Sequence, residues 1–162
     1  DDLIARCDWS QVYGPFALKY RALLETCHAR GLDFYAIEAT RTYDRQQRLY
    51  WQGRTMPGPI VTNADAGQSA HNFGIAVDSC RDASIDRAGL QPSWNLADYE
   101  PLAVEAKSLA LDAAYYWPTF REGPHVQLPL ASRGITLMLL DRILRQKGLV
   151  AVWEFLDEHG PW

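Results

Sequence analysis

The spacing of hydrophobic residues along the chain predicts a mixture of helices and short strands. After a proline at a typical first helical position, Pro15, apolar side chains recur at helical spacing: Phe16, Tyr20, Leu23, Leu24 and Cys27. Shorter runs rich in apolar and aromatic residues indicate strands. The predicted helices cover residues 15–30, 43–52, 98–110, 133–147 and 149–156, and the predicted strands cover 32–40, 74–80 and 124–130. Because these elements do not alternate strictly as βαβ units, the pattern favours an α+β fold.

Glycine, proline and serine residues mark the expected ends of these elements. Gly31 and Gly148 follow predicted helices, and Ser132 is predicted to cap the helix that begins at Arg133. The segment from Arg54 to Gln68 is rich in Pro, Gly and Asn, so we expect a long ordered loop there. Loops of that length inside compact domains are often functional.

Composition and charge narrow the class of protein. The chain has 162 residues, of which 48% are hydrophobic and 22% are charged, which suits one globular domain over residues 1–162. No apolar run approaches the roughly 18 residues that a membrane span needs. The net charge is −4 and the basic residues are scattered, which argues against a nucleic-acid partner.

The chain start and the cysteines add two expectations. The first residues, DDLIARCDWS, lack an initiator Met and the basic-then-apolar pattern of a secretion signal, which leaves open whether an upstream segment was removed. Three cysteines, Cys7, Cys27 and Cys80, cannot all pair with one another. We therefore expect reduced, mostly buried thiols and no disulfide framework.

Two of the four histidines combine with a carboxylate into a candidate metal site. His28 lies near the end of the first predicted helix and His159 lies near the chain end, and both are interpreted as ordinary surface residues. His71 and His125 each stand at the start of a predicted strand, and Asp78 lies within the strand that follows His71. Catalytic zinc takes three such ligands and leaves its fourth position open. These three residues therefore predict one zinc site, with a turn at a glycine between the first two.

A second carboxylate, Glu122, precedes His125 by three residues, with a Gly-Pro turn between them. That spacing can hold an acid beside the open position, where it could take a proton from water and return it to a leaving amine. Taken singly, such histidines are usually satisfied structural residues, and an Asp at a strand end is usually a turn former. Cys80 shares a strand face with Asp78 and is an alternative thiolate ligand.

At these residues the sequence resembles the zinc peptidases that cut bacterial cell-wall peptides. SAHNFGIAVD, residues 69–78, matches the Ser-x-His-x-x-Gly-x-Ala-x-Asp signature of D-Ala-D-Ala carboxypeptidases and of L-alanyl-D-glutamate endopeptidases, and EGPH matches their acid-x-x-His motif. The loop QGRTMPGPIVTNA resembles the endopeptidase branch, which includes phage endolysins. The likeness covers about residues 35–128, whereas the predicted C-terminal helices, residues 132–159, carry no comparable motif. The implied fold is hedgehog- and DD-peptidase-like, a small central antiparallel sheet with helices packed around it.

The resemblance implies a role for each matching residue. It implies that one zinc ion is held by His71, Asp78 and His125, with Glu122 as general base and acid, where many endolysins have Asp. Arg41 matches an arginine that orients or polarises the substrate; its alternative is a surface salt bridge with Asp44 or Glu38. Candidate substrate-binding residues follow: Ser69, Gln46 and Trp117. In the stretch AYYWPTF, it stays open whether Tyr115, Tyr116 or Trp117 lines the cleft.

The resemblance also implies a reaction and a setting. The expected activity is cleavage of the L-Ala–D-Glu bond in peptidoglycan stem peptides, in the periplasm or outside the cell, by a monomer made in the cytoplasm and then released or delivered. Two other activities stay open: a D,D- or L,D-carboxypeptidase that trims the stem peptide, and a non-catalytic zinc-bearing wall-binding module. The biological setting, phage endolysin, bacterial enzyme or delivered toxin, stays open too, as does an immunity or regulatory protein as a partner.

Overall fold

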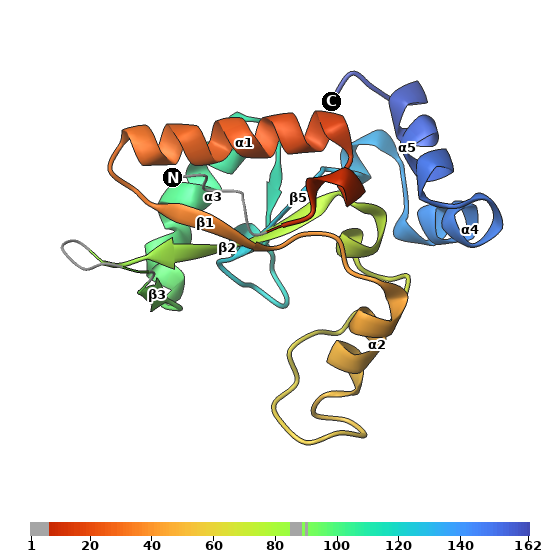
Figure 1. The fold of residues 1–162 in the computed structure, drawn as a ribbon, viewed down its shortest axis with the longest axis horizontal. Coiled ribbons are helices and arrows are strands. Elements are labelled where there is room, and N and C mark those ends of the chain that lie inside the picture. The colour runs from red at the N-terminus through yellow and green to blue at the C-terminus, as the bar shows by residue number, and fades with distance from the viewer. Residues whose placement is uncertain (1–6, 85–88, 90) are drawn as a thin grey trace.

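The computed structural model describes residues 7–84, 89 and 91–162. Residues 1–6, on which much of the expectation about the chain start rests, lie outside the described part. Figure 1 shows a central sheet with helices around it. The α-helices are α1 (Gly14–Ala29), α2 (Tyr43–Trp51), α3 (Glu100–Ser108), α4 (Leu137–Lys147) and α5 (Leu149–Glu158). The strands are β1 (Phe34–Glu38), β2 (Ala76–Asp82), β3 (Pro92–Ser93), β4 (Asp112–Ala113) and β5 (His125–Gln127).

The sheet is antiparallel throughout and has the order β1-β2-β5-β4, with β3 paired to β2. This confirms the predicted α+β class with a small central antiparallel sheet. Short 3-10 helices connect the elements: η1 (Trp9–Gln11), η2 (Ala70–Phe73), η3 (Leu96–Tyr99), η4 (Ala114–Tyr116) and η5 (Ala131–Arg133). Among the described residues, every helix is too short or too polar to cross a lipid bilayer.

Helix α1 covers one face of the sheet and forms much of the core (Figure 1). The five side chains that define its predicted apolar face are all buried: Phe16, Tyr20, Leu23, Leu24 and Cys27. The Tyr20 hydroxyl makes a 2.6 Å hydrogen bond with the Ser79 hydroxyl of β2. Since successive side chains of a strand point to opposite faces, Asp78 points away from α1. The sheet face opposite α1 is therefore where the candidate site lies.

The start of α4 differs from the prediction. Ser132 does not cap this helix; it lies in η5, and its hydroxyl donates a hydrogen bond to the Pro129 carbonyl at 2.9 Å. Thr136 is the cap, because its hydroxyl accepts a hydrogen bond from the Leu139 amide at 3.1 Å. Gly134, in a left-handed conformation at φ 67°, separates the two short helical segments. The predicted end at Gly148 and the predicted last helix are confirmed.

The strands also differ in length from the prediction. The segment 124–130 pairs only from His125 to Gln127, and the two-residue strands β3 and β4 carry no periodic signal in the sequence. In β1 the regular pairing of Ala36 with Ser79 is followed by the pairing of Glu38 with Asp78, which marks a β-bulge at Ile37. A bulge inserts one extra residue into a strand. Here it places Glu38 directly beside Asp78.

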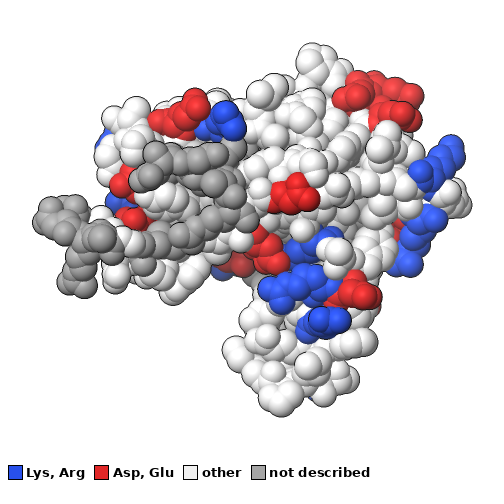
Figure 2. Space-filling view, viewed as in Figure 1, with Lys and Arg blue, Asp and Glu red and all other residues white. Residues whose placement is uncertain are grey.

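Helix α2 and the loop Arg54–Gln68 form a lobe that protrudes from the rest of the molecule (Figure 1). The loop is ordered by its own contacts, because the Arg54 guanidinium donates to the Tyr50 carbonyl at 2.6 Å and to the Thr62 carbonyl at 3.0 Å. Figure 2 shows the end of this lobe as mostly uncharged. Large apolar side chains are exposed there: Trp51, Met56, Ile60 and Val61.

Candidate active site

The site is built on the pairing of β2 with β5. Asp78 and His125 are direct neighbours in this antiparallel pair, so their side chains stand side by side on the face away from α1. The distance from Asp78 Oδ1 to His125 Nδ1 is 3.3 Å. His125 is buried, with only 6% of its surface exposed. The register of two strands that are distant in sequence therefore supplies two of the three candidate ligands.

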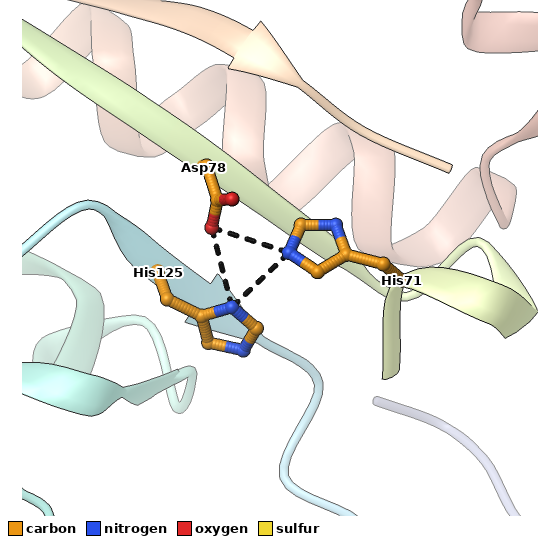
Figure 3. Close-up of side chains that lie close together, drawn as sticks. All are labelled: His71, Asp78 and His125. Atoms are coloured by element: carbon orange, nitrogen blue, oxygen red, sulfur yellow. Dashed lines mark hydrogen bonds and ion pairs between the residues drawn. The ribbon is translucent and has the colours of Figure 1, made fainter. Parts of the chain in front are cut away.

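His71 reaches the same point from the 3-10 helix η2. The Ser69 hydroxyl caps this helix by accepting from the His71 amide, and Gly74 ends it in a left-handed conformation at φ 70°. A side chain at Gly74 would place its Cβ 2.5 Å from the Gln11 carbonyl oxygen, so only glycine fits there without movement. His71 Nε2 lies 3.2 Å from Asp78 Oδ1 and 3.2 Å from His125 Nδ1 (Figure 3).

The opposite nitrogen of each ring is held by a hydrogen bond. His71 Nδ1 donates to the Ala39 carbonyl at 2.6 Å, and His125 Nε2 donates to Gln127 Oε1 at 2.8 Å. In the neutral rings, these bonds leave the lone pairs of His71 Nε2 and His125 Nδ1 facing the Asp78 carboxylate. Sequence reasoning missed Gln127, although its position two residues after His125 on the same strand is a usable signal.

Three electron-pair donors that face one another repel unless a proton or a metal ion lies between them, and the donor set fits zinc. Nitrogen and oxygen ligands about 2.0–2.1 Å from a tetrahedral ion lie about 3.3–3.4 Å from one another. The three measured separations are 3.2, 3.2 and 3.3 Å. Among the described residues, the group that could hold a metal ion consists of His71, Asp78 and His125. Cys80 is not part of that group, although it is buried two residues further along β2.

The charges of the site are consistent with ligation. Burial would raise the pKa of Asp78, but when protons rather than a metal ion occupy the facing nitrogens, the charge of His71 and hydrogen bonds from the two rings outweigh burial and hold that pKa well below its usual range. Burial lowers the pKa of His71, which favours the neutral ring. Burial also opposes protonation of His125, but the protonated ring would donate a hydrogen bond to Asp78 as well as to Gln127, and this raises its pKa. A metal ion competes with a proton for such a nitrogen.

Arg41 lies behind Asp78 and binds the carboxylate oxygen that faces away from the histidines. Its Nη2 is 2.5 Å from Asp78 Oδ2 and 2.8 Å from Glu38 Oε2, and its side chain is only 12% exposed. The salt bridge with Glu38 is thus present, but it is a mostly buried pair joined to a candidate ligand. Burial would raise the pKa of Glu38, but the hydrogen bond and charge of Arg41 lower it. The sequence indicates Glu38 only as a surface partner of Arg41, so its place beside the site is new.

Glu122 stands at the edge of the three-donor group. Its Oε1 is 3.8 Å from His125 Nδ1, and its side chain is 43% exposed. Partial burial and, to a lesser extent, the negative charge of Asp78 raise its pKa. The Gly123 that follows it packs against Tyr99, where a Cβ would lie 2.4 Å from the ring. Glu122 is therefore near the candidate ligands and open to solvent, as a proton carrier must be.

These residues line a cavity of about 450 Å³. Ser69 and Trp117 contribute to its wall, as do residues 61–64 of the loop Arg54–Gln68. The Trp117 ring centre is 5.2 Å from that of His125, and its indole donates to Asp112 at 3.0 Å. Of the three aromatic residues that the sequence leaves open, Trp117 is the one that lines this cavity. Three apolar wall residues were not proposed as cavity residues from the sequence: Leu49, Phe120 and Leu137.

Gln46 occupies a different place from the one that a substrate contact requires. Its side chain is fully buried and is not part of the cavity wall. Its amide accepts from Arg41 Nη1 at 3.3 Å and donates to the Ala64 carbonyl at 2.8 Å. Gln46 thus links Arg41 to the loop Arg54–Gln68 through two hydrogen bonds, so its contacts are those of a residue that positions Arg41.

The remaining histidines and cysteines lie outside this group. His28 pairs with Asp33 at 2.7 Å on the surface, and His159 Nδ1 bonds the Phe155 carbonyl at 2.8 Å. The three cysteines form no disulfide bond, and Cys27 and Cys80 are buried, as predicted.

Comparison with known proteins identifies similar peptidases. The family model described as VanY: D-alanyl-D-alanine carboxypeptidase matches residues 11–115. The chain is 31% identical over 119 residues to the peptidoglycan L-alanyl-D-glutamate endopeptidase CwlK of Bacillus subtilis (strain 168), covering 66% of this chain and 67% of that protein. The family match ends before Glu122 and His125, so the placement of these two residues rests on the geometry above.

Two solved structures have a similar fold. The Serratia marcescens L-Ala D-Glu endopeptidase ChiX aligns with a TM-score of 0.57 and 23% identity, over 76% of this chain and 85% of that one. The LD-carboxypeptidase LdcB aligns with a TM-score of 0.54 and 16% identity, over 79% of this chain and 74% of that one. At these identities, the two comparisons speak for the fold alone.

Proposed function

The chain belongs to the VanY family of D-alanyl-D-alanine carboxypeptidases, and we propose that it is a zinc-dependent endopeptidase that cleaves the L-Ala–D-Glu bond of stem peptides. Membership in this family makes the chain a peptidoglycan peptidase, which is a hydrolase that acts on the cell wall. The observation that carries the zinc site is the convergence of three donor atoms at separations of 3.2 to 3.3 Å.

In this proposal His71, Asp78 and His125 are the zinc ligands, and neighbouring residues fix the orientation of these three side chains. When bound, zinc polarises the scissile carbonyl and makes water acidic enough to lose a proton near neutral pH. The Ala39 carbonyl and Gln127 keep the two rings turned toward the ion, and Arg41 keeps one Asp78 oxygen free to bind it. We assign Arg41 to positioning first; it also lines the cavity, where its charge attracts the substrate carbonyl oxygen.

Glu122 moves the proton. It takes a proton from the attacking water as the carbon–oxygen bond forms, and it gives that proton to the amine of D-Glu as the peptide bond breaks. Its position supports this role, because it is close to His125, partly exposed, and has no ligand position of its own in the three-donor group. The Glu side chain has one more methylene group than the Asp of many endolysins and reaches the same water from a backbone position further away.

Two observations favour the endopeptidase over a carboxypeptidase. The relative with 31% identity is named for L-Ala–D-Glu cleavage, and the loop QGRTMPGPIVTNA, which resembles the endopeptidase branch, contributes residues 61–64 to the cavity wall. The family description, however, names a carboxypeptidase, so trimming of D-Ala is the second candidate. Residues 1–162 form one peptidase domain in this proposal, and Ser69 and Trp117 contact the substrate.

Mass spectrometry of digested muropeptides tests the reaction. An endopeptidase releases the stem peptide from D-Glu onward and leaves L-Ala on the sugar side, whereas a carboxypeptidase removes one D-Ala. Loss of D-Ala alone would replace the proposed bond with the trimming reaction. A zinc-loaded chain that forms neither product would be the non-catalytic wall-binding module, and the Glu122→Gln variant provides the inactive reference.

A further inference from the structure

A second cavity, of about 600 Å³, lies beside the edge strand β4. Its wall combines the end of α3 and β4 with the segment that leads into α4. Two residues, Gln127 and Leu137, line both this cavity and the catalytic cavity. The two cavities are therefore neighbours that share part of their walls.

The shared residues place the second cavity close to the metal site. Gln127 and His125 lie on one face of β5, and Gln127 is paired across the sheet with Asp112 of β4. Gln127 Oε1 is 2.8 Å from His125 Nε2, so this cavity begins one side chain away from a proposed zinc ligand. Leu137, the first residue of α4, also lines both cavities.

The wall chemistry indicates which kind of molecule fits. Leu111, Leu130 and Ile135 make much of the wall apolar. The charged wall residues are Lys107 and Asp112, and the Asp112 carboxylate already accepts the Trp117 indole N–H at 3.0 Å. Lys107 is exposed and lies over the Tyr116 ring, 5.5 Å from its centre. A ligand with small apolar side chains and a free carboxylate would match this wall.

We propose that this second cavity is a subsite for the part of the stem peptide that follows D-Glu. This inference rests on the proposed function. The part after D-Glu consists of a diamino acid and D-Ala; its free carboxylates suit Lys107, and the methyl side chain of D-Ala suits the apolar wall. The part before L-Ala is a neutral sugar, which has no charge for Lys107 and many hydroxyl groups that an apolar wall cannot satisfy. Charge and polarity together select the C-terminal side.

Two substrates that differ only after D-Glu test the subsite: N-acetyl-L-Ala-D-Glu and the same compound extended by a diamino acid and D-Ala. Ala131→Trp fills the cavity from an exposed residue of η5. Ala97→Trp is the matched control, because Ala97 is exposed in the 3-10 helix η3 and lies outside both cavity walls. Zinc content and melting temperature, measured for each variant, show whether the metal site and the fold are intact.

We expect Ala131→Trp to lower kcat/KM for the extended substrate about tenfold more than for the short one, mostly through KM. Lys107→Ala should lower it about two- to fivefold for the extended substrate, the effect of one exposed ion pair, with Lys147→Ala as control. Equal losses on both substrates would overturn the subsite, as would a selective loss on substrates extended with the sugar. If the unchanged chain cleaves neither substrate, the proposed function fails, and the subsite fails with it.

Discussion

Replacing Gln127 with Leu should weaken zinc binding without unfolding the protein. The Gln127 side chain accepts a 2.8 Å hydrogen bond from Nε2 of His125, whose residue surface is only 6% exposed. In the zinc-bound protein, the His125 ring must keep Nδ1 toward the ion. Its Nε2–H group therefore still points at position 127, where leucine offers no oxygen to accept the hydrogen bond. In the metal-free protein, the ring can turn or take a proton. The cost therefore falls mainly on the bound state.

The size of the effect follows from that buried N–H group. An unsatisfied buried donor costs about 1–3 kcal/mol, and about 1.4 kcal/mol corresponds to a tenfold change in affinity. The dissociation constant for zinc should thus rise about 10- to 100-fold, the range usual for residues that orient a metal-binding histidine. Gln127→Glu keeps an acceptor oxygen at this position, so it should bind zinc at least as tightly as the unchanged chain.

Competition with a chromophoric zinc chelator measures these constants directly. Gln146→Leu is the matched control, because Gln146 is exposed on α4 and outside both cavity walls. Melting temperatures of the metal-free proteins show whether the variants are equally folded. If Gln127→Leu binds zinc within twofold of the unchanged chain, the hydrogen bond does not orient His125, and our interpretation of the donor set is wrong.

Further predictions concern the ion, the acid and the turn before β2. Purified chain should contain about one zinc per molecule, and removing the ion with a chelator should abolish wall lysis until zinc is restored; full activity without metal would rule out the zinc site. Glu122→Gln should retain zinc by elemental analysis but lose about 100-fold or more in kcat, and normal lysis by this variant would exclude Glu122 as the proton carrier. Gly74→Ala should lower the free energy of unfolding by more than Gly134→Ala in chemical denaturation, because both glycines have φ near 70° but only a Cβ at Gly74 meets another atom, the Gln11 carbonyl oxygen at 2.5 Å. Equal losses at the two glycines would show that the close approach costs nothing beyond backbone strain.

Parts of the fold can be predicted because they depend on neighbours along the chain. The apolar face of α1 is predictable residue by residue, since helical spacing places those side chains on one side whatever they pack against. The capping of α4 cannot be predicted in this way. Ser132 and Thr136 are both good capping residues four positions apart, and the left-handed turn at Gly134 between them decides which one starts the helix. Strands β3 and β4 are too short for any periodicity and exist because β2 and β5 offer them hydrogen-bonding partners.

The candidate site likewise has a part that the sequence predicts and a part that depends on tertiary structure. Two short motifs carry the residue types of a zinc site, and their spacing by itself indicates His71, Asp78, His125 and Glu122. The register of β2 with β5, the bulge that sets Glu38 beside Asp78, and the packing that brings Leu137 to the cavity depend on segments distant in sequence. The residue types within each short motif can be identified without knowing the fold, so the sequence alone determined which groups could bind a metal. Distances between them arise only when the sheet closes and the helices pack, so the tertiary structure decided that they meet and what surrounds them.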